Sequence, residues 1–357
     1  MNILMISPMY PSTKDPVYGT FIKTYYDNFL SLCRDGHVSM VCIRGKSRGT
    51  LDKVLKYLVF YLEIIYRLLF KNYDVVYVHT ITTPILPVKF ASLFRHHRIV
   101  FNVHGSDVVT VKKTNEILKN MAIPLLYKAC LIVAPSCYFK KVVEEMLPGF
   151  PESRIIVSPS GGVDIEKFSP RPTNNKVVTF GFVSRIDYGK GWDTFIEALS
   201  LLKKKGYIVR GIIAGRGAEE MAMLKMVKVK DVEDIIEYVG PVPHDKLPSL
   251  FRKLDAFVFP TRRSESLGLV GVEALACGIP VVGSNYAALP EYIKNGYNGF
   301  LFNHNDEGDL CDKLASFIKL SGSERERLSL NARQSSLPFK TMAVMKSLYE
   351  KLKCVVK

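Results

Sequence analysis

Short runs of β-branched and apolar residues alternate with helical stretches along the whole chain of 357 residues. Strands that alternate with helices favour parallel sheets whose two faces are covered by helices. The pattern therefore predicts an α/β fold with two series of parallel strands. The runs are Ile3–Ile6, Val38–Ile43, Val75–Val78, Ile99–Val103, Leu131–Ala134 and Ile155–Val157, and then Val177–Val183, Ile208–Ala214, Ile235–Val239, Ala256–Phe259 and Ile279–Val282.

The segment Ser169-Pro-Arg-Pro-Thr-Asn-Asn175 separates the two series of predicted strands. Two prolines and two asparagines in seven residues are typical of a linker. We therefore expect residues 1–170 and 171–339 to form two Rossmann-like domains of similar size. A last helix, Thr341–Lys353, is predicted after the second domain.

Polar motifs directly follow several of the predicted strands. Tyr18-Gly-Thr-Phe21 comes in the loop after the first strand, and His104-Gly-Ser-Asp107 follows the fourth. Arg185-Ile-Asp-Tyr-Gly-Lys190 and Glu265 follow two strands of the second series. In an open parallel sheet, ligands bind beyond the carboxyl ends of the strands. The sequence therefore predicts binding sites at these ends.

Two glutamates, Glu265 and Glu273, stand eight positions apart around a predicted helix start. Gly268 and Leu269 open that helix, which is predicted over Val270–Ala276. A helix start presents free backbone N–H groups and a partial positive charge, which suit a phosphate. Carboxylates on either side can accept hydrogen bonds from sugar hydroxyls. One stretch can therefore hold a sugar, a ribose and the phosphates between them.

This stretch resembles the Glu-x7-Glu signature of retaining glycosyltransferases of family 4, which have the GT-B fold. The match covers Glu265-Ser-Leu-Gly-Leu and Glu273-Ala-Leu-Ala-Cys-Gly-Ile-Pro-Val-Val. The resemblance implies two facing Rossmann-like domains with parallel sheets, and a crossover helix at about residues 340–357 that returns to the first domain.

The resemblance also implies roles for the residues of the motif. Glu265 is expected to bind hydroxyls of the transferred sugar, and Glu273 is expected to bind the ribose. The family commonly has Gly-Phe-Gly after the first glutamate, whereas this chain has Ser266-Leu267-Gly268, so the identity of the sugar stays open. The backbone N–H groups that are expected to help hold the sugar and the phosphates are those of Ser266, Leu267, Gly268 and Leu269.

Arg185 and Lys190 resemble the Arg…Lys-Gly segment that holds the donor diphosphate in this family. The leaving diphosphate is a dianion, whose charge must be neutralised as the glycosidic bond breaks. Arg185 can make a forked contact, and Lys190 can supply a point charge. No Asp-x-Asp pair occurs in the chain, so the resemblance implies transfer without a metal ion.

Three further residues are assigned to the donor site by resemblance. His104 is expected to make a hydrogen bond to the sugar, with a structural role as the alternative. Gly19 would let the backbone approach the donor phosphates. Val242 lies in Val239-Gly-Pro-Val-Pro-His-Asp-Lys-Leu247, which resembles the segment whose backbone contacts the nucleobase. Side chains therefore do not decide which base is bound; a UDP-sugar is favoured, with a GDP-sugar as the alternative.

The formal net charge is +15, of which +8 lies in residues 1–170 and +7 in residues 171–357. Nucleic acid, an anionic membrane and phosphorylated small molecules are the partners that such charge could serve. No RNP box or zinc finger accompanies it, so nucleic acid is not expected. Seven scattered cysteines without a C-x-x-C pair suit a reducing cytosol.

The segment Leu51–Phe70 is predicted to be a helix with two apolar faces. One face can dock on the sheet. The other needs either more protein or a membrane surface, which its aromatic residues beside Lys and Arg would suit. Its first stripe is Leu51, Leu55, Leu58, Leu62, Ile65 and Leu69, and its polar stripe is Lys53, Lys56, Glu63 and Arg67.

The expected function is that of a metal-independent, retaining hexosyltransferase without a cofactor. It would move a sugar from a nucleotide-sugar to a glycan or lipid-linked glycan in surface polysaccharide or lipopolysaccharide biosynthesis. We expect a cytoplasmic protein, with a peripheral place on the inner face of the cell membrane if Leu51–Phe70 contacts lipid. Two alternatives are a sugar-nucleotide epimerase and a non-catalytic subunit that binds nucleotide-sugar.

Overall fold

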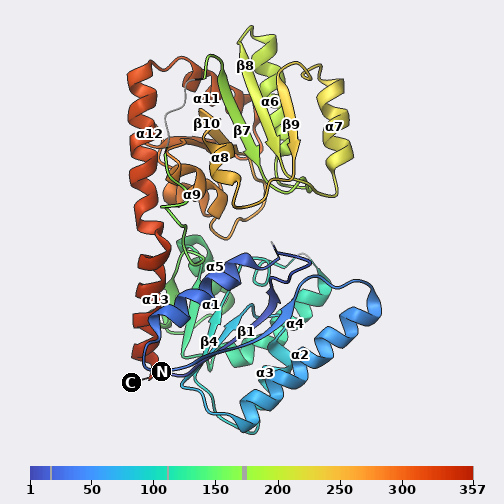
Figure 1. Cartoon of the computed structure of the whole chain (residues 1–357), viewed down its shortest axis with the longest axis vertical. Coiled ribbons are helices and arrows are strands. Elements are labelled where there is room, and N and C mark those ends of the chain that lie inside the picture. The colour runs from blue at the N-terminus through green and yellow to red at the C-terminus, as the bar shows by residue number, and fades with distance from the viewer. Residues whose placement is uncertain (17, 111, 171–174, 357) are drawn as a thin grey trace. The chain divides into compact units, whose positions relative to one another are not determined.

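The computed structural model describes residues 1–16, 18–110, 112–170 and 175–356, which form two compact units (Figure 1). Unit 1 comprises Met1–Gly162 and Met342–Lys357, and unit 2 comprises Val163–Thr341. Most of the linker predicted at 169–175 lies outside the described residues, because residues 171–174 are not among them.

Unit 1 contains a six-stranded parallel sheet in the order β2-β1-β3-β4-β5-β6. Four of its strands, Ile3–Tyr10, Val75–His79, Ile99–Asn102 and Leu131–Ala134, are buried along almost their whole length, as expected for a parallel sheet covered on both faces. The strands are β1 Ile3–Tyr10, β2 Val38–Arg44, β3 Val75–His79, β4 Ile99–Asn102, β5 Leu131–Ala134 and β6 Ile155–Val157.

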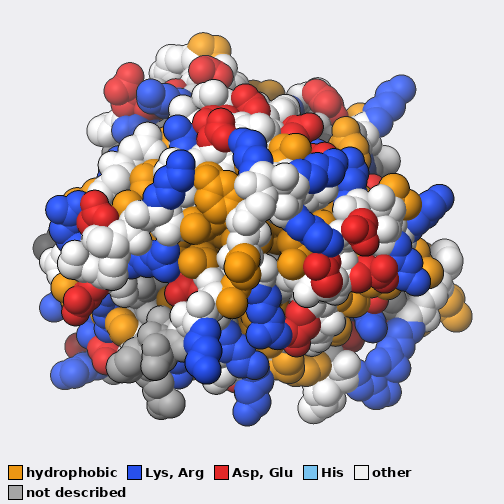
Figure 2. Space-filling model, turned by 90° about the horizontal axis from the view of Figure 1, so that it is seen from above, with side chains coloured by type: hydrophobic (Ala, Val, Ile, Leu, Met, Phe, Trp, Pro, Cys, Tyr) orange, Lys and Arg blue, Asp and Glu red, His pale blue; other side chains and the backbone are white. Residues whose placement is uncertain are grey.

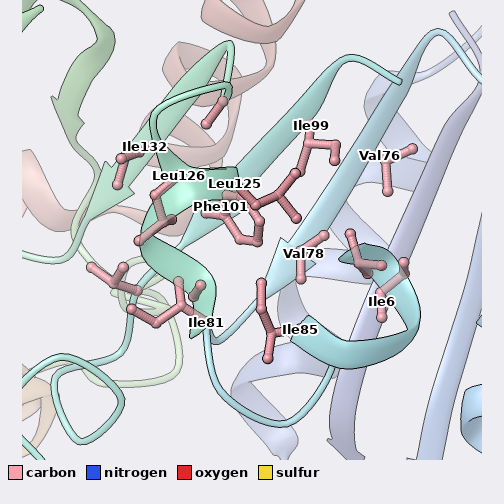
Figure 3. Close-up of a cluster of buried hydrophobic side chains, with 14 of the residues drawn as sticks. Ile6, Val76, Val78, Ile81, Ile85, Ile99, Phe101, Leu125, Leu126 and Ile132 are labelled. Atoms are coloured by element: carbon pink, nitrogen blue, oxygen red, sulfur yellow. The ribbon is translucent and has the colours of Figure 1, made fainter. Parts of the chain in front are cut away.

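Helices cover both faces of this sheet. Side chains of α2, α3, α4 and α5 pack on one face, where Ile6, Val78 and Phe101 lie in one cluster with Ile85 and Leu125 (Figure 3). Side chains of α1 and α13 pack on the other face. The helices are α1 Thr20–Leu32, α2 Thr50–Phe70, α3 Ile85–Ala91, α4 Lys113–Leu126, α5 Cys137–Met146 and α13 Thr341–Val356, with the 3₁₀ turn η1 Glu152–Arg154.

The last helix of the chain, α13, belongs mostly to unit 1 although the residues before it belong to unit 2. Its apolar side chains Met345, Leu348 and Leu352 are buried beside Tyr25 and Phe29 of α1. Burial of these apolar side chains holds α13 on the sheet of unit 1.

Unit 2 repeats the architecture with a second six-stranded parallel sheet, in the order β12-β11-β10-β7-β8-β9. Its strands are β7 Val178–Val183, β8 Val209–Ala214, β9 Ile236–Gly240, β10 Ala256–Phe259, β11 Val281–Ser284 and β12 Gly299–Phe302. Its helices are α6 Trp192–Lys204, α7 Glu220–Val229, α8 Leu247–Phe251, α9 Leu269–Ala276, α10 Leu289–Tyr292, α11 Glu307–Ile318 and α12 Gly322–Ser336, with the 3₁₀ turn η2 Leu337–Phe339.

The predicted α/β class with two parallel sheets is confirmed. One strand, β12, was not predicted, because Gly299-Phe-Leu-Phe302 is short and begins with a glycine. That glycine is required by packing, since a Cβ atom at Gly299 would lie 1.9 Å from the carbonyl oxygen of Val281 on the neighbouring strand.

The basic side chains do not form one uniform surface on the face drawn in Figure 2. Lys and Arg side chains are scattered there among acidic and hydrophobic ones. This agrees with a net charge that the sequence spreads over both halves of the chain.

Candidate active site

Two loops of unit 2, one after β7 and one after β10, lie directly against each other. The backbone N–H of Arg262 donates to the carbonyl oxygen of Gly189 at 2.8 Å. A Cβ atom at Gly191 would lie 1.9 Å from the carbonyl oxygen of Pro260, and Gly191 has φ +82°. Glycine therefore allows an approach that a side chain would prevent.

This approach brings the predicted Lys190 and Glu265 into direct contact. Lys190 Nζ lies 2.7 Å from Glu265 Oε1, and both side chains are mostly buried, at 13% and 15% exposure. The hydroxyl of Thr261, which is fully buried, donates to the same Glu265 oxygen at 2.9 Å. The second oxygen, Oε2, has no hydrogen-bond partner within the described ranges, so it can accept from a ligand.

Arg185 stands at the start of the same loop, and its side chain is 67% exposed. Its guanidinium contacts Asp187 at 2.7 Å. Asp187 in turn accepts from the backbone N–H of Ala218 at 3.0 Å and so belongs to the folded loop. Arg185 therefore extends into solvent from a fixed base, and Lys190 is held at the other end of the loop.

Helix α9 begins beside Glu265, and Gly268 is its N-cap. Gly268 has φ +80°, and a Cβ atom there would lie 2.7 Å from the ring of Phe259. As a glycine, Gly268 has no side chain to cap the helix start, which leaves backbone N–H groups there for another acceptor. Leu267 is buried in the core at 2% exposure. Burial explains why an apolar side chain follows Ser266, which is only partly exposed.

Glu273 lies on α9 and is nearly buried, at 8% exposure. His244, from the loop between β9 and α8, places its Nε2 atom 2.7 Å from Glu273 Oε1. The His244 ring packs on Phe168 with its centroid at 5.3 Å. Val242 lies two residues before His244 and packs against the same core cluster. The segment predicted to contact a nucleobase is therefore tied to the helix that carries Glu273.

The remaining predicted residues, His104 and Gly19, belong to unit 1. His104 Nε2 lies 3.0 Å from Nδ1 of His79 at the end of β3, and the two rings are stacked. Burial lowers the pKa of His104 to about 4 and holds the pKa of His79 well below its usual value. Both imidazoles are therefore neutral near pH 7, and they share one hydrogen bond.

The loop that carries His104 is fixed by Asp107. This buried carboxylate accepts from the backbone N–H groups of His104 at 2.9 Å and Ile81 at 3.0 Å. The Phe21 ring packs on the His104 ring with centroids 5.1 Å apart. Gly19, at φ +74°, stands two residues before Phe21 and is the N-cap of α1. Within unit 1, Phe21 therefore connects the start of α1, which Gly19 caps, to His104.

Three residues of these clusters were not singled out from the sequence: Thr261, His244 and His79. Thr261 and His244 lie within the segments that carry the motifs, but their contacts depend on the fold. His79 ends β3, and only the pairing of β3 with β4 brings it to His104. The sequence signal that could have indicated His79 is its place as a polar residue at the end of an otherwise apolar strand.

No cluster suited to a metal ion occurs in the part of the chain that the structure describes, where a cluster means three or more His, Cys, Asp or Glu side chains. Each glutamate instead has one titratable partner: Glu265 contacts Lys190, and Glu273 contacts His244. This arrangement offers cations and hydrogen-bond acceptors to an anionic, hydroxyl-rich ligand.

Comparison with known proteins connects both units to one class of enzymes. Residues 164–335 match the family model of glycosyl transferases group 1, and residues 35–136 match that of glycosyl transferase 4-like proteins. WcaL of Escherichia coli K12, named as a glycosyltransferase of colanic acid biosynthesis, is 31% identical over 52% of this chain and 47% of its own length. The D-inositol 3-phosphate glycosyltransferase of Mycolicibacterium smegmatis is 30% identical over 47% of this chain and 41% of its own length.

The chain thus spans about half the length of the curated relatives that it matches. Among solved structures, HepE of Anabaena in complex with UDP has a TM-score of 0.78 at 19% identity, over 99% of this chain and 100% of its own. This likeness shows the fold, and the GT-B fold expected from the sequence is confirmed. Both units thus match models of glycosyl transferases, unit 2 that of group 1 and unit 1 that of the 4-like proteins, and the chain is similar to this class of enzymes.

Proposed function

We propose that this chain is a retaining glycosyltransferase that moves a sugar from a nucleotide-sugar to a glycan or lipid-linked glycan. The contact between Lys190 and Glu265 beside the uncapped start of α9 carries the proposal. It combines a cation, a carboxylate and free backbone donors in one place. A nucleotide-sugar offers the matching groups, namely phosphates and sugar hydroxyls.

Lys190 and Arg185 would stabilise the diphosphate as it leaves. Negative charge grows on that group when the bond to the sugar breaks, and fixed cations lower the energy of this state. Arg185 is exposed and would exchange its contact with Asp187 for a phosphate oxygen, as Lys190 would exchange its contact with Glu265. Because two cations supply this charge, we propose transfer without a metal ion.

The two glutamates would divide the donor between them. Glu265 keeps Oε2 available for a sugar hydroxyl, with Ser266 next to it and the backbone of Leu267–Leu269 on the phosphate side. Glu273 would accept from the ribose hydroxyls, while His244 holds its other side. Val242 would offer its backbone to the base. On unit 1, we propose that neutral His104 makes a hydrogen bond to the sugar and that Gly19 admits the donor phosphates.

A UDP-sugar is the favoured donor, and a GDP-sugar is the alternative. HepE, which shares the fold, has been solved with UDP and with UDP-glucose. The name of WcaL supports a place in the biosynthesis of a surface polysaccharide. We propose that the reaction takes place on the cytoplasmic side of the cell membrane, where a lipid-linked acceptor would be met.

The test is release of nucleotide from UDP-sugars and GDP-sugars, with a glycan-lipid extract as acceptor, in the presence and absence of EDTA. We expect release that EDTA does not reduce, and a product with the anomeric configuration of the donor. Glu265→Ala should lose this activity. Glu237→Ala, which removes an exposed acid of the same unit, should keep it. Equal release by Glu265→Ala and wild type would disprove the site, and loss of release in EDTA would disprove the metal-free reaction.

A further inference from the structure

Helix α2 has two opposite apolar faces, and only one of them is covered. Phe60, Ile64 and Leu68 recur every four residues and are buried against the sheet of unit 1. At about 100° per residue, the opposite side of the helix carries a second apolar stripe. Eight of its side chains are between 51% and 75% exposed: Leu51, Val54, Leu55, Leu58, Val59, Leu62, Tyr66 and Phe70.

The exposed stripe continues onto the turn that follows α3. The guanidinium of Arg95 donates to the carbonyl oxygens of Leu69 and Lys71 at 3.1 and 3.0 Å, which ties this turn to the end of α2. Leu93 and Phe94, just before Arg95, are 75% and 68% exposed, and Leu86 and Phe90 of α3 are exposed as well. Together these side chains form the α2–α3 surface.

This concentration of exposed apolar side chains is not repeated elsewhere within the described ranges. Twelve of the 27 large hydrophobic side chains found exposed there lie between Leu51 and Phe94. Those of unit 2, such as Ile208, Met221 and Leu330, are separated along the chain. A single exposed apolar residue is ordinary, but a contiguous patch of this kind marks an interaction surface.

The same segment is strongly basic. Residues 44–98 contain ten Lys and Arg but only three Asp and Glu, a net charge of +7 out of +15 for the whole chain. Lys53 and Lys56 lie on α2 itself, and Lys56 reaches the carbonyl oxygen of Lys46. Lys53 Nζ lies 6.0 Å from the centroid of the Tyr57 ring, and Tyr66 packs on Phe70 farther along the helix. Apolar and aromatic side chains bordered by cations suit the interface of an anionic bilayer.

We infer that the α2–α3 surface docks on an anionic phospholipid bilayer, with α2 lying in the plane of the interface. No described helix is long and apolar enough to cross a membrane, so α2 would lie on the bilayer. A second copy of the chain is a poorer occupant, because a two-fold contact would bring together two copies of the segment 44–98, each with a net charge of +7. The inference rests on the proposed function only for its purpose, which is to bring the enzyme to a lipid-linked acceptor.

The test is co-sedimentation of the full chain with vesicles of phosphatidylcholine alone or mixed equally with phosphatidylglycerol, without nucleotide. We expect binding to the anionic vesicles at low salt and much weaker binding at high salt, because screening removes the attraction. The double variant Leu58→Glu/Leu62→Glu should bind at least about tenfold more weakly, because two apolar side chains become acidic. The matched control Leu330→Glu, on an exposed leucine of α12, should bind like wild type.

Both variants change exposed side chains, so thermal unfolding should match that of wild type and show that folding is intact. Glu265→Gln should bind vesicles like wild type, which separates docking from the donor site. Equal binding of wild type and the double variant would overturn the inference. So would equal binding to both kinds of vesicle, absence of binding to anionic vesicles, or formation of a dimer in solution that the double variant abolishes.

Discussion

The two units share one architecture but carry different chemistry at the carboxyl ends of their strands. In unit 2, the loops after β7, β9 and β10 place Lys190 in an ion pair with Glu265, and His244 in a hydrogen bond with Glu273. In unit 1, the ends of β3 and β4 place the two stacked imidazoles of His79 and His104, which burial keeps neutral. A charged edge suits a diphosphate and its sugar hydroxyls, whereas a neutral edge offers hydrogen bonds without attracting ions.

This difference indicates that the residues at the strand ends, and not the sheets themselves, determine which ligand each unit can bind. Both sheets have six parallel strands and apolar cores. What distinguishes them is which polar residue ends each strand and whether a counter-charge reaches it. Substitutions that remove one partner of each pair therefore test the comparison directly.

The largest effect is expected from removing the cation of unit 2. Lys190→Ala should lower the rate of sugar transfer roughly 10²–10³-fold, because one fixed charge would no longer stabilise the leaving diphosphate. Initial rates of nucleotide release at saturating donor measure this effect. Lys203→Ala, which breaks an exposed ion pair of the same unit, serves as the control and should leave the rate unchanged. A rate for Lys190→Ala close to that of wild type would show that Lys190 does not stabilise the leaving diphosphate.

An intermediate effect is expected at the ribose side of the same unit. Glu273→Gln should weaken binding of the nucleoside diphosphate about tenfold, because a hydrogen bond to a charged acceptor is lost. His244→Ala should weaken binding about threefold, because the carboxylate stays but loses the contact that orients it. Titration calorimetry measures both constants. If His244→Ala weakened binding more than Glu273→Gln, the histidine and not the glutamate would be the ribose contact.

The neutral pair of unit 1 is tested by stability and not by activity. The pKa of His104 is about 4 in the folded chain and about 6.5 when the chain is unfolded, so between these values the unfolded state binds more protons. The contribution of His104 to the free energy of unfolding is therefore fully present above pH 6.5 and is lost as pH falls toward 4. At pH 5 the free energy of unfolding is lower by roughly 2 kcal/mol.

Thermal unfolding at pH 7 and pH 5 measures this loss. His104→Gln should show a smaller fall in Tm between the two values than wild type does. His96→Gln, at an exposed histidine, should behave like wild type. The same fall in Tm for His104→Gln and wild type would show that His104 is not a buried neutral group.

Much of the fold could be predicted because the parallel strands are buried on both faces. Runs such as Val75–Val78 and Leu131–Ala134 therefore stand out as uninterrupted apolar segments between helices. Strand β12 could not be predicted in the same way, since it opens with Gly299 and two of its four residues are only partly buried. Its pairing with β11 depends on close backbone approach, which no local pattern records.

The candidate site shows the same limit. The residues Glu265, Glu273 and Lys190 stand in motifs that are recognisable locally, but the contact between Lys190 and Glu265 joins residues 75 positions apart. His244 and His79 meet their partners only through loops and strand pairing. Likewise, the two apolar faces of α2 are visible in the sequence, but the sequence does not show which of them the sheet covers.

We propose that unit 2 holds a nucleoside diphosphate through its own cations. Titration calorimetry of UDP, GDP and ADP against the full chain in EDTA tests this claim most directly, with Arg185→Ala/Lys190→Ala as the comparison. We expect UDP to bind in EDTA, and we expect the double variant to bind it at least about tenfold more weakly. Absence of binding by all three nucleotides, or equal affinity of wild type and the double variant, would contradict the proposal.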